Sequence, residues 1–383
     1  MNTNKSNAKG NLICSRCSHA NPLDATHCQK CNKFLVIASI PTNDRANKSK
    51  LPPYVTWLGL ALILLPFSVG GYFFWQQVKS LTNSNSLNSP LGNSSSDIRL
   101  YNSFKKVPNV PTGIFNYGGA VLFASITASG THEAMTRTHP HFRLVYTEPR
   151  FGKPGNSQSL TMLLNGELSF AQIALPLTDT EYSKAKERGF SLEQVPVAID
   201  AIVVFTHPDV YVPGISVIQL QDIYKGKITN WKQVGGPDLP IVPFARPKVA
   251  TLLHVLLGPE VDKVSPNVQY IRDYTECVRK VSSTPGGISF GGSGPILGQK
   301  SIRIIALAKG NSQKYVQPFI DNGKQINTAA IQDGTYPISR RLFIAIRRDG
   351  RIDEQAGVAY TNMLLSKEGQ QFIERSGFVP LLR

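Results

Sequence analysis

Four of the five cysteines are grouped near the N-terminus in a spacing that suits a metal ion. They form two Cys-x-x-Cys pairs, Cys14 with Cys17 and Cys28 with Cys31. Two such pairs can bring four thiolates into the tetrahedron that Zn²⁺ prefers. We therefore predict a structural zinc ion bound by these four cysteines, in a segment too short to fold without its metal. The fifth cysteine, Cys277, stands alone and is expected to be a buried helix residue, not a reactive thiol.

The segment that holds the cysteine pairs, residues 12–36, resembles the small zinc-ribbon family that often precedes a membrane helix. In that family an Asn-Pro-x-x-Ala stretch separates the pairs, and this sequence has Asn21, Pro22 and Ala25. One departure is Ser18, where the family usually has glycine after the first pair. The resemblance agrees with zinc as the cofactor of this segment.

Residues 54–75 form an uncharged apolar run that is long enough to cross a bilayer as a helix. Tyrosine and tryptophan stand at both ends, as is typical of membrane interfaces. Three basic residues lie between positions 45 and 50, and the positive-inside rule therefore puts the N-terminus and the zinc ribbon in the cytoplasm. We expect a single-pass inner-membrane protein whose remaining chain is periplasmic.

The composition is that of a globular protein with an excess of positive charge. Hydrophobic residues make up 41%, charged residues 17%, and the formal net charge is +16. Such a charge attracts nucleic acid, anionic lipid or an anionic solute, and does not choose among them. Nucleic-acid binding would rest on the small basic ribbon alone and is not expected. The chain has no hydrolase nucleophile elbow, P-loop or zinc-protease helix motif, so we predict that it is not an enzyme.

From residue 111 onward, short apolar strands alternate with helices, which predicts βαβ units and a mostly parallel sheet. Before this domain, residues 1–11 are expected to be a disordered tail and residues 79–110 a flexible Ser/Asn-rich linker. Strands are expected at 142–147, 170–174, 241–245 and 303–307, a strand with a Gly-rich turn at 113–123 and at 285–290, and helices at 131–139, 159–165, 180–189, 216–224, 250–257, 267–281 and 355–375.

Two further strands are expected to connect the halves of this domain. Residues 195–204 read V-P-V-A-I-D-A-I-V-V, the longest apolar, β-branched run outside the membrane segment. Residues 336–348 (Y-P-I-S-R-R-L-F-I-A-I-R-R) are the expected return partner. We interpret the pair as the two crossings between the lobes of a clamshell. Asp200, in the middle of the first run, is expected to form hydrogen bonds at the hinge and not to bind ligand.

Several stretches closely resemble the periplasmic substrate-binding proteins of phosphate ABC transporters. These are the connecting strands, residues 220–241 with the sequence G-K-I-T-N-W followed by G-G-P, and the tail at 366–381. The resemblance implies an α/β, two-lobed type II periplasmic-binding fold over residues 111–383. Lobe 1 would comprise about 111–195 and 338–383, and lobe 2 about 196–337, with a ligand held between them.

The resemblance also implies four loops that should bind an oxyanion through hydroxyls, backbone amides and an arginine. The first loop (residues 120–122) and the third (173–175) carry only Ala, Val, Leu and Ile, where the family usually has hydroxyl groups in the first and Ser-Ser-Arg in the third. The second and fourth loops keep polar groups, so the predicted ligand-binding residues are Ser157, Ser159, Arg246, Lys248 and Thr251. Because aliphatic side chains cannot donate hydrogen bonds to an anion, we expect phosphate binding to be weakened or lost, unless these residues rebuild the site.

Two functions of different classes fit this arrangement. The first is a membrane-anchored receptor that captures phosphate, another oxyanion or another small ligand and passes it to an ABC-transporter permease. The second is a transmembrane sensor or scaffold that couples the periplasmic clamshell to the zinc ribbon and a signalling partner. A cytoplasmic ribbon favours the sensor, because a transporter receptor needs nothing on that side of the membrane.

Overall fold

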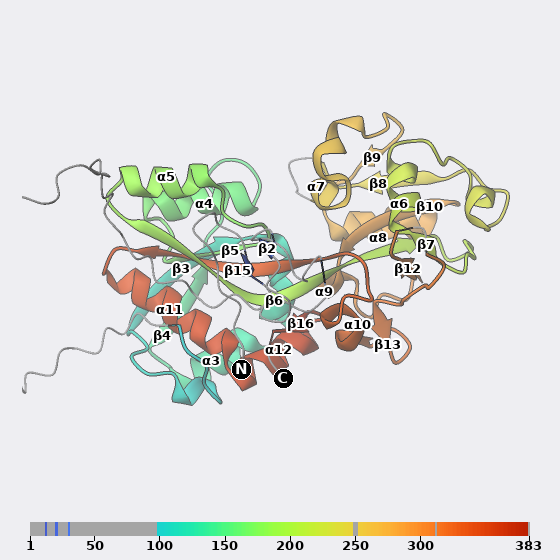
Figure 1. The fold of residues 1–383 in the computed structure, drawn as a ribbon. Helices are drawn as coiled ribbons and strands as arrows, with labels where there is room; N and C mark the ends of the chain where they lie inside the picture. Colours follow the sequence, from blue (N-terminus) through green and yellow to red (C-terminus); the bar gives the residue numbers. More distant parts are fainter. Residues whose placement is uncertain are drawn as a thin grey trace, which may run out of the picture. The chain divides into compact units, whose positions relative to one another are not determined.

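The long strand β6 (Ser191–Thr206) organises the computed structural model of this protein (Figure 1). The structure describes residues 12–13, 20–21, 30, 98–247, 252–310 and 312–381. The predicted tail and membrane helix and most of the predicted ribbon and linker lie outside these residues. Within the described part of the chain, no helix is long and apolar enough to cross a membrane.

The first half of the sheet forms lobe 1, and it combines parallel and antiparallel pairs. Its strand order is β4-β3-β5-β15-β6, with β3 parallel to β4 and β5, and β15 antiparallel to β5 and β6. The strands are β3 (Gly113–Gly119), β4 (Phe142–Tyr146), β5 (Phe170–Ile173) and β15 (Ser339–Arg348).

Helices cover both faces of the lobe 1 sheet (Figure 1). The helices and short 3-10 turns of lobe 1 are η1 (Phe104–Lys106), η2 (Val121–Phe123), α2 (Ala124–Ala128), α3 (Thr131–Thr138), α4 (Asn156–Asn165), α5 (Asp179–Glu187), α11 (Ile352–Leu365) and α12 (Lys367–Arg375). Side chains alternate along β15, so Phe343 and Ala345 pack with α4 and α5, while Ile344 and Ile346 pack with α3 and α11.

Lobe 2 is built on the other end of β6, in the order β6-β10-β8-β9. Here β10 is antiparallel to β6, and β8 is parallel to both β10 and β9. Its strands are β7 (Ile215–Ser216), β8 (Val242–Ala245), β9 (Gln269–Tyr270), β10 (Gly287–Gly292), β11 (Arg303–Ile305), β12 (Leu307–Ala308), β13 (Phe319–Ile320) and β14 (Gln325–Ile326). Its helices and turns are α6 (Val217–Tyr224), η3 (Trp231–Val234), α7 (Leu252–Leu257), η5 (Gly258–Lys263), α8 (Tyr274–Ser283), α9 (Ser293–Ile296) and α10 (Thr328–Gln332).

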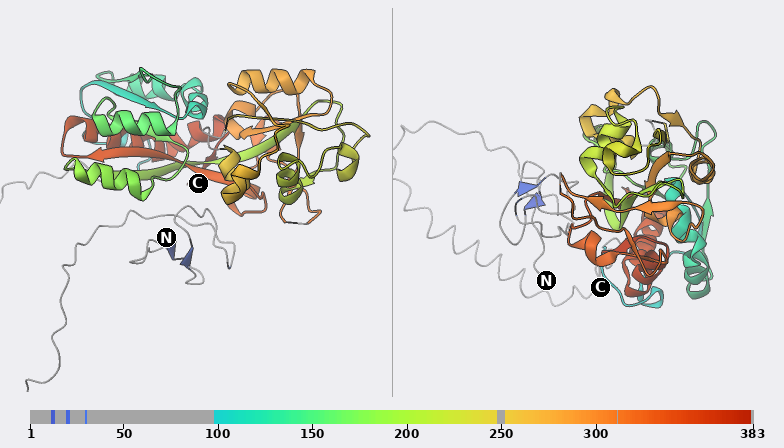
Figure 2. Two further views of the ribbon diagram at one scale, coloured as in Figure 1. Left: turned by 90° about the horizontal axis from the view of Figure 1, so that it is seen from above. Right: turned by 90° about the vertical axis from the view of Figure 1, so that its right-hand side faces the viewer.

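The two lobes meet along β6 and β15 (Figure 2). From Ser191 to Ala201, β6 pairs with β15, and from Ile202 onward it pairs with β10. The change of partner therefore falls about six residues beyond the expected lobe boundary at residue 195. The short C-terminal strand β16 (Val379–Pro380) also pairs with β6, at Ile199 and Ala198.

Two expected helices include residues that the structure assigns to a strand or to the break between two helices. The helix expected at 267–281 is wrong at its start, because β9 pairs there with β8 and α8 begins only after Asp273. The Asp273 side chain accepts a hydrogen bond from the backbone amide of Glu276 and caps the helix. The helix expected at 355–375 is two helices, because Ser366 adopts extended backbone angles and caps α12 by accepting from the amide of Gly369.

Candidate functional site

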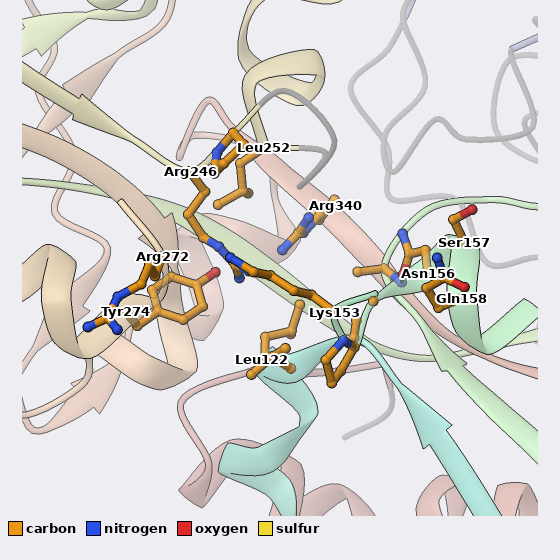
Figure 3. Close-up of a pocket in the computed structure, with 16 residues that line it drawn as sticks. Leu122, Lys153, Asn156, Ser157, Gln158, Arg246, Leu252, Arg272, Tyr274 and Arg340 are labelled. Atoms are coloured by element: carbon orange, nitrogen blue, oxygen red, sulfur yellow. Dashed lines mark hydrogen bonds between the residues drawn. The ribbon is translucent and has the colours of Figure 1, made fainter. Parts of the chain in front are cut away.

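A cavity of about 400 Å³ lies between the lobes, beside the two connecting strands (Figure 3). Both lobes and β15 line it. The lining residues are Ala120, Val121, Leu122, Lys153, Pro154, Gly155, Asn156, Ser157, Gln158 and Ala174 from lobe 1, Arg246, Pro247, Leu252, Arg272 and Tyr274 from lobe 2, and Arg340 from β15.

Lobe 1 presents the N-terminus of α4 to this cavity. The first helical residues, Asn156, Ser157 and Gln158, line it, and no side chain caps the helix at Gly155. The free amides and the helix dipole favour an anion at such an end. The exposed Lys153, just before the helix, adds a formal positive charge. Ser157, one of the predicted site residues, is thus part of the cavity wall.

Ser159 is placed differently from Ser157. It is buried, does not line the cavity, and its hydroxyl donates to the carbonyl oxygens of Gly155 and Asn156, at 2.9 and 3.0 Å. The reason is local, because α4 begins three residues earlier than expected and thus includes Ser159 within its first turn. Two more of the predicted residues, Lys248 and Thr251, lie outside the described residues.

Lobe 2 contributes Arg246, which follows the carboxyl end of β8. Its guanidinium carbon lies 5.6 Å from the ring centroid of Tyr274, which also lines the cavity. The Arg246 Nε is buried and has no hydrogen-bond partner in the part of the chain that the structure describes. A buried guanidinium donor without a partner is costly unless a bound group accepts from it.

Arg340 reaches the cavity from the hinge, where it pairs with Asp200. The Arg340 Nε lies 2.9 Å from Asp200 Oδ2, and both side chains are buried. The backbone amide of Ser293 donates to Asp200 Oδ1 at 2.8 Å. Burial raises the pKa of Asp200, and the charge of Arg340 and the hydrogen bonds from Ser293 oppose that rise. Asp200 thus forms hydrogen bonds at the hinge, as expected from the sequence, and the structure adds that it orients Arg340.

The balance of charge in the cavity is positive. Arg272 is paired with Glu276, with 3.1 Å between Nε and Oε2. Among the described residues that line the cavity, none is Asp or Glu, whereas three are Arg and one is Lys. Such a set of positive charges and hydrogen-bond donors can attract and bind an anion.

The first and third loops give the cavity an apolar side. The amide of Ala120 donates to the Gln172 carbonyl at 2.8 Å, and the amide of Ala174 donates to Asn156 Oδ1 at 2.9 Å. These two amides are therefore already used within the protein. The side chains there are aliphatic, and Val121 is 40% exposed.

Sequence reasoning missed Lys153, Arg272, Tyr274 and Arg340 as cavity residues. Arg340 carried a signal, because an arginine inside an apolar strand needs a partner or a ligand. The other three lie in loops or at a helix start, and no local pattern distinguishes them from surface residues.

Metal ligands are not clustered in the described ranges, which exclude the four N-terminal cysteines. Cys277 is buried on α8, where its Sγ lies 3.0 Å from the Ser289 hydroxyl, and burial raises the pKa of the thiol to about 11. Cys277 is thus a buried helix residue, as predicted from the sequence.

A family model described as a PBP superfamily domain matches residues 111–373. The chain belongs to this superfamily. It is 25% identical over 243 residues to the phosphate-binding protein PstS of Pseudomonas aeruginosa, covering 59% of this chain and 72% of that protein. It is 28% identical over 241 residues to the protein SphX of Synechococcus elongatus, covering 60% of this chain and 68% of that protein.

Solved structures of the same fold include two bacterial binding proteins. A Clostridium perfringens substrate-binding protein with bound phosphate superposes with a TM-score of 0.56 at 19% identity, covering 70% of this chain and 100% of that one. An ABC-type phosphate transport receptor from Vibrio cholerae gives a TM-score of 0.53 at 23% identity, covering 69% and 99%. The predicted two-lobed α/β fold and the prediction of a binding protein, not an enzyme, are confirmed.

Proposed function

We propose that this protein is an extracytoplasmic anion receptor, akin to the phosphate-binding component of an ABC transporter, and that it hands its ligand to a permease. The observation that carries the proposal is the cavity between the lobes, where Lys153, Arg246, Arg340 and the N-terminus of α4 converge and no described carboxylate lines the wall. Curated relatives named as phosphate-binding proteins support the same class of ligand.

The site is proposed to be altered, so that it binds inorganic phosphate more weakly than a site lined by hydroxyls would. A phosphate ion needs hydrogen-bond donors around all of its oxygens, because its desolvation is costly. Two loop amides are already bonded within the protein, and Ser159 donates to the backbone. Of the residues predicted from the sequence, Ser157, Arg246, Lys248 and Thr251 remain as candidate ligands, beside Lys153 and Arg340.

Calorimetric titration of the full-length protein in detergent with inorganic phosphate tests the altered site. We expect binding weaker than micromolar, and micromolar or tighter binding would contradict the alteration.

Thermal unfolding with phosphate, sulfate and methylphosphonate tests the receptor itself. A ligand that binds only the folded state raises the midpoint, so at least one anion should do so. Arg246→Gln should weaken that binding by about 10–100-fold, because it removes one charge-assisted hydrogen bond to the anion. Arg279→Gln, an exposed position on α8, is the matched control and should leave binding unchanged. If no anion raises the midpoint, the receptor proposal fails.

A second candidate function is a transmembrane sensor, which the N-terminal cysteines favour. The described strands β1 (Leu12–Ile13) and β2 (Ala20–Asn21) pair antiparallel, and Cys14 and Cys17 stand between them in the sequence. This pairing supports a zinc ribbon, which would be cytoplasmic if residues 54–75 span the inner membrane. A sensor would change the reactivity of the ribbon cysteines toward a thiol reagent when an anion binds, whereas a transporter receptor would not.

A further inference from the structure

The wall of the cavity is divided into a cationic part and an aliphatic part. Lobe 2 and β15 supply Arg246 and Arg340, which Figure 3 shows extending into the same space as Lys153. The aliphatic part comes mainly from lobe 1, with one leucine from lobe 2: Ala120, Val121, Leu122, Ala174 and Leu252. An inorganic anion such as phosphate has no apolar surface that could be buried against this aliphatic part.

Val121 is the most informative residue of the aliphatic part. It is 40% exposed and follows Ala120, whose backbone amide is bonded to Gln172. Its side chain is therefore not committed to the core, and burying it against a ligand would be favourable.

The donors approach from three directions. Arg246 comes from the end of β8, Arg340 from the hinge, and the amides of α4 from lobe 1. Such a set fits a head group with three oxygens, as in a phosphonate or phosphate ester, better than a planar carboxylate with two. The cavity volume of about 400 Å³ leaves room beside such a head group, since ligand pockets of roughly 300–1,000 Å³ hold organic molecules.

From these observations we infer that the ligand is an organophosphorus anion with a compact aliphatic substituent, an alkylphosphonate or a phosphate monoester. This inference rests on the proposed anion receptor and specifies its ligand. The phosphorus oxygens accept from Arg246, from Arg340 and from the start of α4. The substituent packs against Val121 and its aliphatic neighbours.

The test is a calorimetric series on the full-length protein in detergent, with inorganic phosphate, methylphosphonate, ethylphosphonate and n-butylphosphonate as probes. Each methylene that is buried against the aliphatic part should strengthen binding about fourfold. This factor corresponds to the free energy of transferring one methylene from water to an apolar environment. Affinity should thus rise from methyl to butyl and exceed that for phosphate. Methyl phosphate and butyl phosphate repeat the comparison for esters and identify which of the two head groups is preferred.

Two matched variants locate the aliphatic contact. Val121→Ser should weaken n-butylphosphonate binding several-fold and leave methylphosphonate nearly unchanged, because a methyl group has much less apolar surface to bury against Val121 than a butyl chain has. Val145→Ser is the control, since Val145 is similarly exposed, at 44%, but lies on β4 and does not line the cavity. It should change neither affinity.

The outcomes separate this inference from the proposed function. If the anions bind and depend on Arg246, but chain length and Val121→Ser have no effect, the organic ligand is refuted and the anion receptor stands. If inorganic phosphate binds more tightly than every phosphonate and ester, the inference is likewise refuted. If no anion binds, the receptor fails, and the inference fails with it.

Discussion

Asp200 and Arg340 form a buried ion pair at the place where both connecting strands pass between the lobes. Asp200 does not line the cavity, whereas Arg340 does. The carboxylate thus holds an arginine in position for a ligand and offsets its charge in the absence of one. Gly292 packs against Asp200, since a Cβ added there would lie 2.7 Å from Oδ2, so the pair has little room to rearrange.

Asp200→Asn should lower the free energy of unfolding by about 3 kcal/mol, because it removes the carboxylate from a buried ion pair. Arg340→Gln in the same chain should recover part of the loss, with a coupling energy of about 1 kcal/mol or more in a double-mutant cycle. Denaturant unfolding of the full-length protein measures both. Asp238→Asn, which breaks an exposed pair with Lys232, is the control and should cost less than about 1 kcal/mol. Equal costs at the two sites would contradict a structural role for the hinge pair.

At the scale of elements, the end of β3 is pressed against β5 where the first cavity loop begins. A Cβ added at Gly119 would lie 2.1 Å from the carbonyl oxygen of Gln172. That oxygen accepts the hydrogen bond from the amide of Ala120. The close approach of the two strands therefore fixes the position of the aliphatic loop that lines the cavity.

Gly119→Ala should destabilise the protein by about 2–3 kcal/mol, because the backbone of β3 or β5 must move to admit the methyl group. Gly155→Ala is the matched control: no atom lies within 4 Å of the added Cβ, and its φ of 167° is extended backbone. It should change the unfolding free energy by no more than about 0.5 kcal/mol. A similar midpoint for both variants in thermal unfolding would contradict the close packing of β3 on β5.

For the molecule as a whole, the proposed topology places the binding domain and the cysteine pairs on opposite sides of a membrane. Its basis is the uncharged run at 54–75 and the basic residues before it. The relatives named as phosphate-binding proteins are consistent with an extracytoplasmic domain.

Protease added to spheroplasts that express the full-length chain should digest the domain beyond residue 111 and spare an epitope tag at the N-terminus. After lysis both parts should be cleaved, which is the control for accessibility of the tag. Cleavage of the tag in intact spheroplasts would reverse the topology, and protection of both parts would leave the domain in the cytoplasm.

Local patterns in the sequence determined much of this architecture. The β-branched run around Asp200 predicted the strand that connects the lobes, because its apolar side chains must be buried on both faces of a sheet. The spacing of the four cysteines predicts a zinc site in the same local way, and the metal content of the purified protein tests it. The sequence resemblance identified the superfamily and named Ser157 and Arg246, which both line the cavity.

Only the tertiary structure decided which groups line the cavity. About ninety residues separate Lys153 from Arg246, and about ninety separate Arg246 from Arg340. The folding of the two lobes brings all three to one cavity. The structure also shows that Ser159 bonds to its own helix and that the amides of Ala120 and Ala174 are already occupied. Hydrogen-bonding capacity is a property of a residue type, but whether a donor is free depends on neighbours that the chain supplies from distant positions.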